Sequence, residues 1–146
     1  MVYVKTSDIH FLPGLIPKHD ERFSALLTGA VSGDVLIYFA AVPLALCVPF
    51  DLDYRPDLHP LGRQAIAQAF GAWSNGKFQT LLVYQRGKSF VVSDDYIPLF
   101  AALRGQPDCV PCWIFGKPDG DLARDVQGPI AQEDVREILG LGGKRR

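Results

Sequence analysis

Two adjacent aspartates, Asp94 and Asp95, are the first residues in this chain whose types suggest chemistry. They lie in the run Ser93-Asp94-Asp95-Tyr96, directly before a predicted helix. Carboxylate oxygens bind Mg²⁺, and such a site would take a third carboxylate, for which Asp51 or Asp53 is available. Acidic residues at a helix start more often cap its free N–H groups and oppose its dipole. We therefore predict capping here and keep a Mg²⁺ site as the alternative.

Cys109 and Cys112 have the C-x-x-C spacing of a redox pair or of half a zinc site. A redox pair normally lies at a helix N-terminus, where the dipole lowers the thiol pKa, whereas this pair leads into a predicted strand. A zinc site would need two further ligands, and none is found at a matching spacing. The remaining cysteine and histidines are Cys47, His10, His19 and His59. We interpret the thiols as buried structural residues.

The sequence contains no recognisable nucleophile or phosphate-binding loop. There is no Gly-x-Ser-x-Gly elbow and no Gly-x-x-x-x-Gly-Lys run. His59 lies near Arg55 and Asp57 and is a candidate for a polar site, although a single loop histidine is usually only solvated. The catalytic residues, if there are any, are therefore unknown.

A proline-bounded run, residues 48–56, is the best candidate for a partner surface. Its aromatic and charged side chains could be presented by a rigid backbone, with Phe50, Tyr54, Arg55 and the following His59 as contact residues. The simpler interpretation is a loop that covers a sheet edge.

The composition limits the classes of protein to which this chain can belong. The 146 residues carry 15 Lys and Arg against 16 Asp and Glu, and 48% are apolar. This excludes a disordered tail, a collagen-like repeat and a strongly basic nucleic-acid arm, and it favours one domain over residues 1–146. The most apolar stretch, residues 35–50, is too short for a bilayer helix and contains Pro43 and Pro49. We expect a cytoplasmic, non-membrane protein.

Hydrophobic spacing and capping residues predict an α+β order. Asp20 begins a helix that ends at Gly33, a second helix covers 61–75, a third follows Asp94 or Asp95 and stops at Gly105, and a fourth covers 131–139. Strands are predicted over 3–11, 35–41, 78–84, 89–93 and 110–115, with a hairpin loop at 85–88. Residues 117–128 are predicted to be a loop, and 141–146 a frayed basic tail.

The central segment, residues 61–116, resembles the ParB N-terminal/sulfiredoxin-like family. The similarity lies in the helix 61–75, Leu81-Leu82-Val83-Tyr84, Arg86-Gly87-Lys88, Phe90-Val91-Val92, the helix to Gly105 and Val110-Pro111. It implies a mixed sheet flanked by helices. Family members that act on nucleotide phosphates carry a Gly-x-x-Arg type element in the loop before this helix, and sulfiredoxin chemistry uses a cysteine there. This chain has Ser93-Asp94-Asp95-Tyr96 instead.

The resemblance, with its altered loop, implies a bacterial-type, non-catalytic binding module that acts through a protein partner or a small ligand, and no cofactor is expected. The alternative is a metal-dependent nucleotide-binding protein or a phosphoryl-transfer or nuclease-type enzyme. In it, Asp94 and Asp95 hold Mg²⁺ and Arg86, Lys88 or Arg104 meets phosphate. A second alternative is a DNA-binding accessory factor, against which the net charge of −1 argues. A homodimer through residues 35–50 is a further hypothesis.

Overall fold

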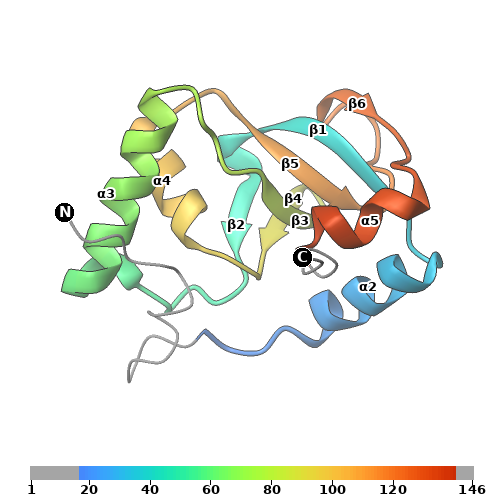
Figure 1. Cartoon of the computed structure of the whole chain (residues 1–146), viewed down its shortest axis with the longest axis horizontal. Helices are drawn as coiled ribbons and strands as arrows, with labels where there is room; N and C mark the ends of the chain where they lie inside the picture. The colour runs from blue at the N-terminus through green and yellow to red at the C-terminus, as the bar shows by residue number, and fades with distance from the viewer. Residues whose placement is uncertain (1–16, 141–146) are drawn as a thin grey trace.

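A six-stranded mixed sheet with the order β2-β4-β3-β5-β1-β6 forms the centre of the protein (Figure 1). This computed structural model describes residues 17–140. The strands are β1 (Ile37–Pro43), β2 (Cys47–Pro49), β3 (Leu81–Arg86), β4 (Ser89–Val92), β5 (Cys109–Phe115) and β6 (Arg124–Gln127). The α-helices are α2 (Glu21–Ser32), α3 (Pro60–Ser74), α4 (Ile97–Gly105) and α5 (Gln132–Ile138), with short 3₁₀ turns η1 (Leu44–Leu46) and η2 (Pro56–Leu58). The predicted α+β class is confirmed.

The two faces of the sheet belong to different cores because side chains alternate along each strand. On β5, Val110, Cys112 and Ile114 face a cluster that includes Leu99 of α4. Phe115, on the opposite face, packs in a cluster supplied by α2 and α5. Strands β3 and β5 are parallel, whereas β3 with β4 and β1 with β5 are antiparallel. The helices α3 and α4 pack against each other at one end of the sheet, and α2 and α5 lie at the other (Figure 1).

Capping residues set the helix boundaries much as the sequence predicts. The Asp20 carboxylate accepts hydrogen bonds from the N–H groups of Arg22 and Phe23, and Gly33 ends α2 with a left-handed φ of 93°. His59 Nδ1 accepts from Leu61 N at 3.1 Å at the start of α3. Asp95 Oδ1 accepts from Ile97 N at 3.0 Å, but the N-cap residue of α4 is Tyr96, so Asp95 lies one residue before the predicted capping position.

One prediction along the chain is wrong. Residues 117–128, expected to be a loop, contain the edge strand β6, which pairs with β1. All four β6 residues are exposed, so the strand has no buried face and shows none of the hydrophobic alternation that marks a strand in sequence. The apolar segment 35–50 supplies β1, which lies between β5 and β6. The predicted strand 3–11 and tail 141–146 lie outside the described residues. None of the described helices has the length and apolarity to cross a bilayer.

Close backbone approach fixes the start of α3 against η2. A Cβ added to Gly62 would lie 1.8 Å from the carbonyl oxygen of Pro56. Gly71, in the same helix, has no atom within 4 Å of the equivalent position.

We predict opposite effects for two glycine-to-alanine substitutions in α3. Gly62→Ala should lower the free energy of unfolding by about 1–3 kcal/mol because backbone must move. Gly71→Ala should raise it by about 0.5–1 kcal/mol because alanine favours a helix. Urea unfolding followed by circular dichroism measures both, and equal effects would contradict the close contact at Gly62.

Candidate functional site

The predicted loop Ser93-Asp94-Asp95-Tyr96 holds elements of the fold together. Besides its bond from Ile97 N, Asp95 accepts from Gln79 Nε2 at 3.1 Å. The buried Tyr96 hydroxyl accepts from Asp51 N at 2.8 Å, which joins α4 to the segment after β2. Ser93 donates to the Asp20 carboxylate. The contacts of Ser93, Asp95 and Tyr96 thus join this loop to α2, to the segment before β3 and to the segment after β2.

Asp20 is a buried carboxylate at the centre of this network. It is 6% exposed, and besides Ser93 it accepts from Tyr84 Oη at 2.7 Å. Burial alone would raise the pKa of Asp20, but the hydrogen bonds from Ser93, Tyr84 and two backbone N–H groups outweigh it and the pKa is lowered. Burial and the bond to Asp20 raise the pKa of Tyr84 to about 12, so its hydroxyl stays a donor.

The structure does not bring the predicted phosphate-binding side chains to the aspartates. Arg86 ends β3 and Lys88 lies in the turn between β3 and β4, at the opposite end of these strands from residues 93–96. A six-residue strand spans about 17 Å, which is too far for a shared ligand contact through side chains at both ends. Arg104 lies at the end of α4, with its guanidinium 4.6 Å from the centroid of the Phe70 ring.

The Asp51 carboxylate, one of those considered for a metal, accepts hydrogen bonds from two backbone N–H groups. Asp51 Oδ1 accepts from Asp53 N at 3.0 Å, and Oδ2 accepts from Lys18 N at 2.8 Å. Within residues 17–140 there is no group of three or more His, Cys, Asp or Glu side chains that could hold a metal ion. Through these contacts Asp51 stabilises the loop that follows β2.

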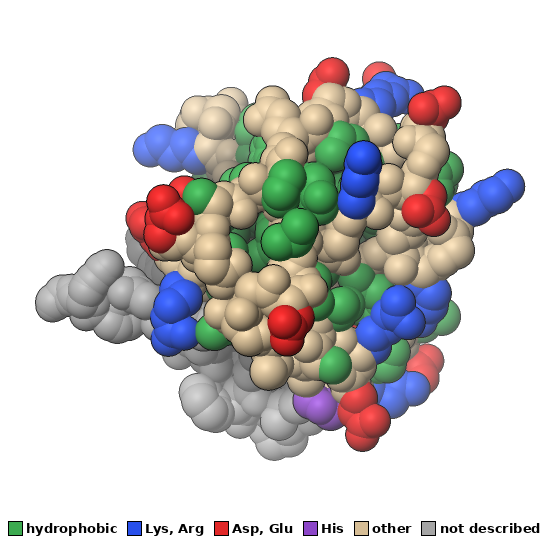
Figure 2. Space-filling model, turned by 90° about the vertical axis from the view of Figure 1, so that its right-hand side faces the viewer, with side chains coloured by type: hydrophobic (Ala, Val, Ile, Leu, Met, Phe, Trp, Pro, Cys, Tyr) green, Lys and Arg blue, Asp and Glu red, His purple; other side chains and the backbone are tan. Residues whose placement is uncertain are grey.

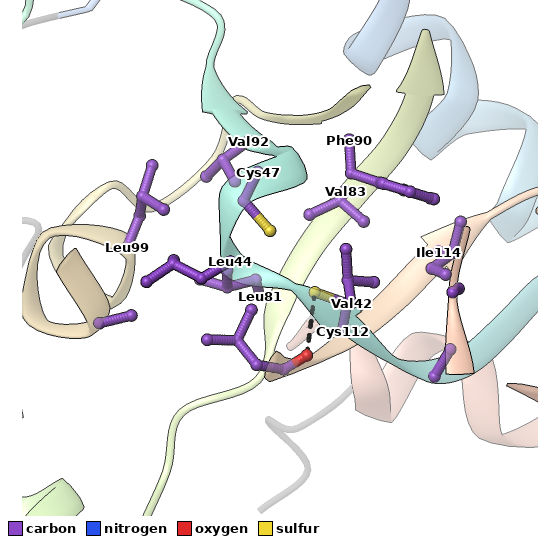
Figure 3. Packing of buried hydrophobic residues seen from close by; sticks show 14 residues of the cluster. Val42, Leu44, Cys47, Leu81, Val83, Phe90, Val92, Leu99, Cys112 and Ile114 are labelled. Atoms are coloured by element: carbon purple, nitrogen blue, oxygen red, sulfur yellow. Dashed lines mark hydrogen bonds between the residues drawn. The ribbon is translucent and has the colours of Figure 1, made fainter. Parts of the chain in front are cut away.

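The C-x-x-C cysteines point to opposite faces of the sheet. Because Cys109 and Cys112 are three residues apart on one strand, their Cα atoms are about 10 Å apart, beyond the reach of a disulfide. Cys112 instead contacts Cys47, and its Sγ donates to the Val110 carbonyl at 3.7 Å (Figure 3). The hydrogen bond with Cys47 and burial raise the pKa of the Cys112 thiol.

The proline-bounded run forms one wall of a groove of about 590 Å³ against α3 and α4. We call it the α3–α4 groove. Its lining residues are Pro49, Leu52, Tyr54, Arg55, Asp57, Arg63, Ile66, Phe100, Leu103 and Arg104. Three arginines and one aspartate surround apolar side chains, so the groove is both hydrophobic and positively charged.

The predicted partner residues are divided between this groove and the core. Arg55 is exposed in the groove, where its Nε and Nη2 donate to Asp57 at 2.9 and 2.7 Å. Tyr54 lines the groove but is only 4% exposed, with its ring 4.9 Å from that of Tyr96. Phe50 is half-buried against the α2 face of the sheet, and His59 caps α3. The groove therefore retains Arg55 and a small part of Tyr54 from the predicted set.

On the helical side of the groove, the sequence singles out only Arg104, and as a possible phosphate-binding residue. Arg63, Ile66 and Leu103 belong to no motif in the sequence.

The other end of the molecule has a different charge arrangement. Around α2, α5 and β6, basic and acidic side chains are interspersed among hydrophobic ones (Figure 2). Charges of both signs so close together largely cancel, so this face offers no extended basic track for a polyanion.

The lowered pKa of Asp20 predicts a specific acid sensitivity. Its folded pKa lies below the ordinary 3.8, so the stability that it contributes is complete above that value and is lost as the pH falls through the folded pKa. At pH 7, Asp20→Asn should cost about 1–3 kcal/mol. Urea unfolding measured from about pH 6 to pH 2 should show the difference in unfolding free energy between the wild type and Asp20→Asn becoming smaller. A difference that stays constant over this range would contradict the lowered pKa of Asp20.

The cysteine placement predicts selective alkylation. In the folded protein, iodoacetamide should modify the half-exposed Cys109, while buried Cys47 and Cys112 react only after unfolding in urea. Mass spectrometry of peptides from the two conditions tests this. Modification of Cys112 under native conditions at the rate of Cys109 would refute its burial.

No family model matches the chain, and no curated protein or solved structure matches it either. The likeness of residues 61–116 to the ParB N-terminal/sulfiredoxin-like family thus stays a prediction.

Proposed function

We propose that this protein is a non-catalytic binding module that recognises an acidic peptide segment of a partner protein in the α3–α4 groove. The segment would present a hydrophobic side chain flanked by carboxylates. The observation that carries this proposal is the position of exposed Leu52 and Leu103 beside three arginines in one groove.

The hydrophobic part of the groove supplies the anchoring surface. Leu52 is 74% exposed and Leu103 39% exposed, and half-buried Phe100 lies beside them. Large apolar side chains that remain exposed together, with charged groups around them, are typical of protein-binding sites. A leucine or aromatic side chain of the partner would remove this surface from water.

The charges of the groove determine which charge a partner segment must carry. Asp57 is held by Arg55, so one carboxylate faces three guanidinium groups and the groove keeps an excess of positive charge. Arginine binds carboxylates through two parallel hydrogen bonds, which gives direction as well as attraction. Arg63 and Arg104 are exposed on the helical side, where a partner carboxylate can reach them.

The wall formed by the proline-bounded run is held in place before a partner binds. Asp51 accepts two backbone hydrogen bonds, its own N–H donates to Tyr96, and the Tyr54 and Tyr96 rings pack edge to face. A fixed wall loses little conformational entropy on binding, which favours affinity.

Selection of phage-displayed peptides on the folded protein tests the proposal. We expect enriched peptides to combine Asp or Glu with Leu, Phe or Trp. Their affinity should fall about tenfold in Leu52→Ser or Arg63→Glu, and salt should weaken binding.

Matched controls are available on the same molecule. Leu58 is 67% exposed and Arg86 is exposed, and neither lines the groove. Leu58→Ser and Arg86→Glu should therefore leave peptide affinity unchanged. The proposal fails if no acidic peptide is enriched, or if groove and control variants weaken binding equally.

A further inference from the structure

A second hollow lies on the opposite side of the α3–α4 pair from the groove. It is a cavity of about 170 Å³ between the two helices and the first residues of β3 and β5. We call it the alanine cavity. Its lining residues are Ala65, Gln68, Ala69, Ala72, Trp73, Lys77, Phe78, Gln79, Leu81, Ile97, Pro98, Ala101, Ala102, Val110 and Pro111.

Small side chains create this cavity. Ala65, Ala69 and Ala72 recur on one side of α3, and Ala101 and Ala102 face them from α4. Helix pairs normally fill such a space with larger side chains to the density of a crystal. Here the two helices touch closely where the Trp73 ring of α3 packs on Gly105 of α4, and the alanine positions stay open.

The size of the alanine cavity selects a single ring. An apolar protein cavity of about 150 Å³ stays dry and binds benzene. At about 170 Å³, with walls of alanine, leucine, isoleucine, valine, proline and tryptophan, this cavity has room for one six-membered ring and no more.

Apart from Gln68 on α3, the polar side chains of the lining lie where the chain leaves α3 for β3. Lys77 is exposed and has no ion pair within residues 17–140. Phe78 is 54% exposed beside it, with its ring 5.4 Å from that of Trp73. Gln79, bonded to Asp95, fixes the position of this connection. A ring in the cavity that carried an anionic group would place that group near the Lys77 ammonium.

We propose that the alanine cavity is a binding site for a small carboxylic acid with a single six-membered ring. The ring occupies the apolar interior and the carboxylate pairs with Lys77 at the opening. This proposal is independent of the α3–α4 groove and does not require a peptide partner.

Benzoate is the probe that tests it, with benzamide as a neutral match of the same shape and acetate as an acid without a ring. Saturation-transfer NMR should show contact of the protein with the benzoate ring. Chemical-shift titration should give tighter binding for benzoate than for benzamide, and none for acetate.

Three variants assign the binding to this cavity. Lys77→Ala should weaken the affinity for benzoate by about two- to fivefold, which is the usual effect of an exposed ion pair. The affinity for benzamide should be unchanged. Ala69→Leu fills the cavity and should abolish binding of both, with circular dichroism confirming the fold. Lys88→Ala, an exposed lysine on the β3–β4 turn, should change neither affinity.

The proposal is overturned if benzoate gives no saturation transfer. It is also overturned if Ala69→Leu folds and still binds both rings, or if Lys77→Ala and Lys88→Ala weaken benzoate equally.

Discussion

The buried carboxylate of Asp20 joins parts of the chain that are far apart in sequence. It caps α2, and it also receives the hydroxyls of Tyr84 on β3 and Ser93 after β4. A carboxylate out of water is stable only when its oxygens are hydrogen-bonded, so α2, β3 and the loop before α4 must come together around it. The position of α4 follows from that loop.

The order of most elements follows from local sequence rules. Asp20 and Gly33 bound the first described helix, and Asn75 directly follows the second. These signals act within a few residues, which makes them visible without the fold. Strand β6 was not predicted because its four residues are exposed on both sides and show no hydrophobic alternation.

Only part of the candidate site could be predicted from the sequence. Residues 48–56 were recognisable because prolines and aromatic residues are close together in sequence. Their opposite wall, with Arg63 and Leu103, comes from helices whose pairing depends on contacts across the fold. The contact of Ser93 with Asp20 spans 73 residues, a separation that no spacing rule addresses. Sequence thus identified single segments, and tertiary packing decided which of them share a surface.

The helices α3 and α4 form a partition with a solvent-facing hollow on each side. Ile66 and Phe100 face the groove, while Ala69 and Ala101 face the cavity. A small change in the separation of these helices alters both spaces together. Any occupant that favours one helix spacing therefore has an energetic coupling to the other space, and thermodynamics requires that coupling to be equal in both directions. The two hollows are thus the two faces of one wall, and their shapes depend on the same helix packing.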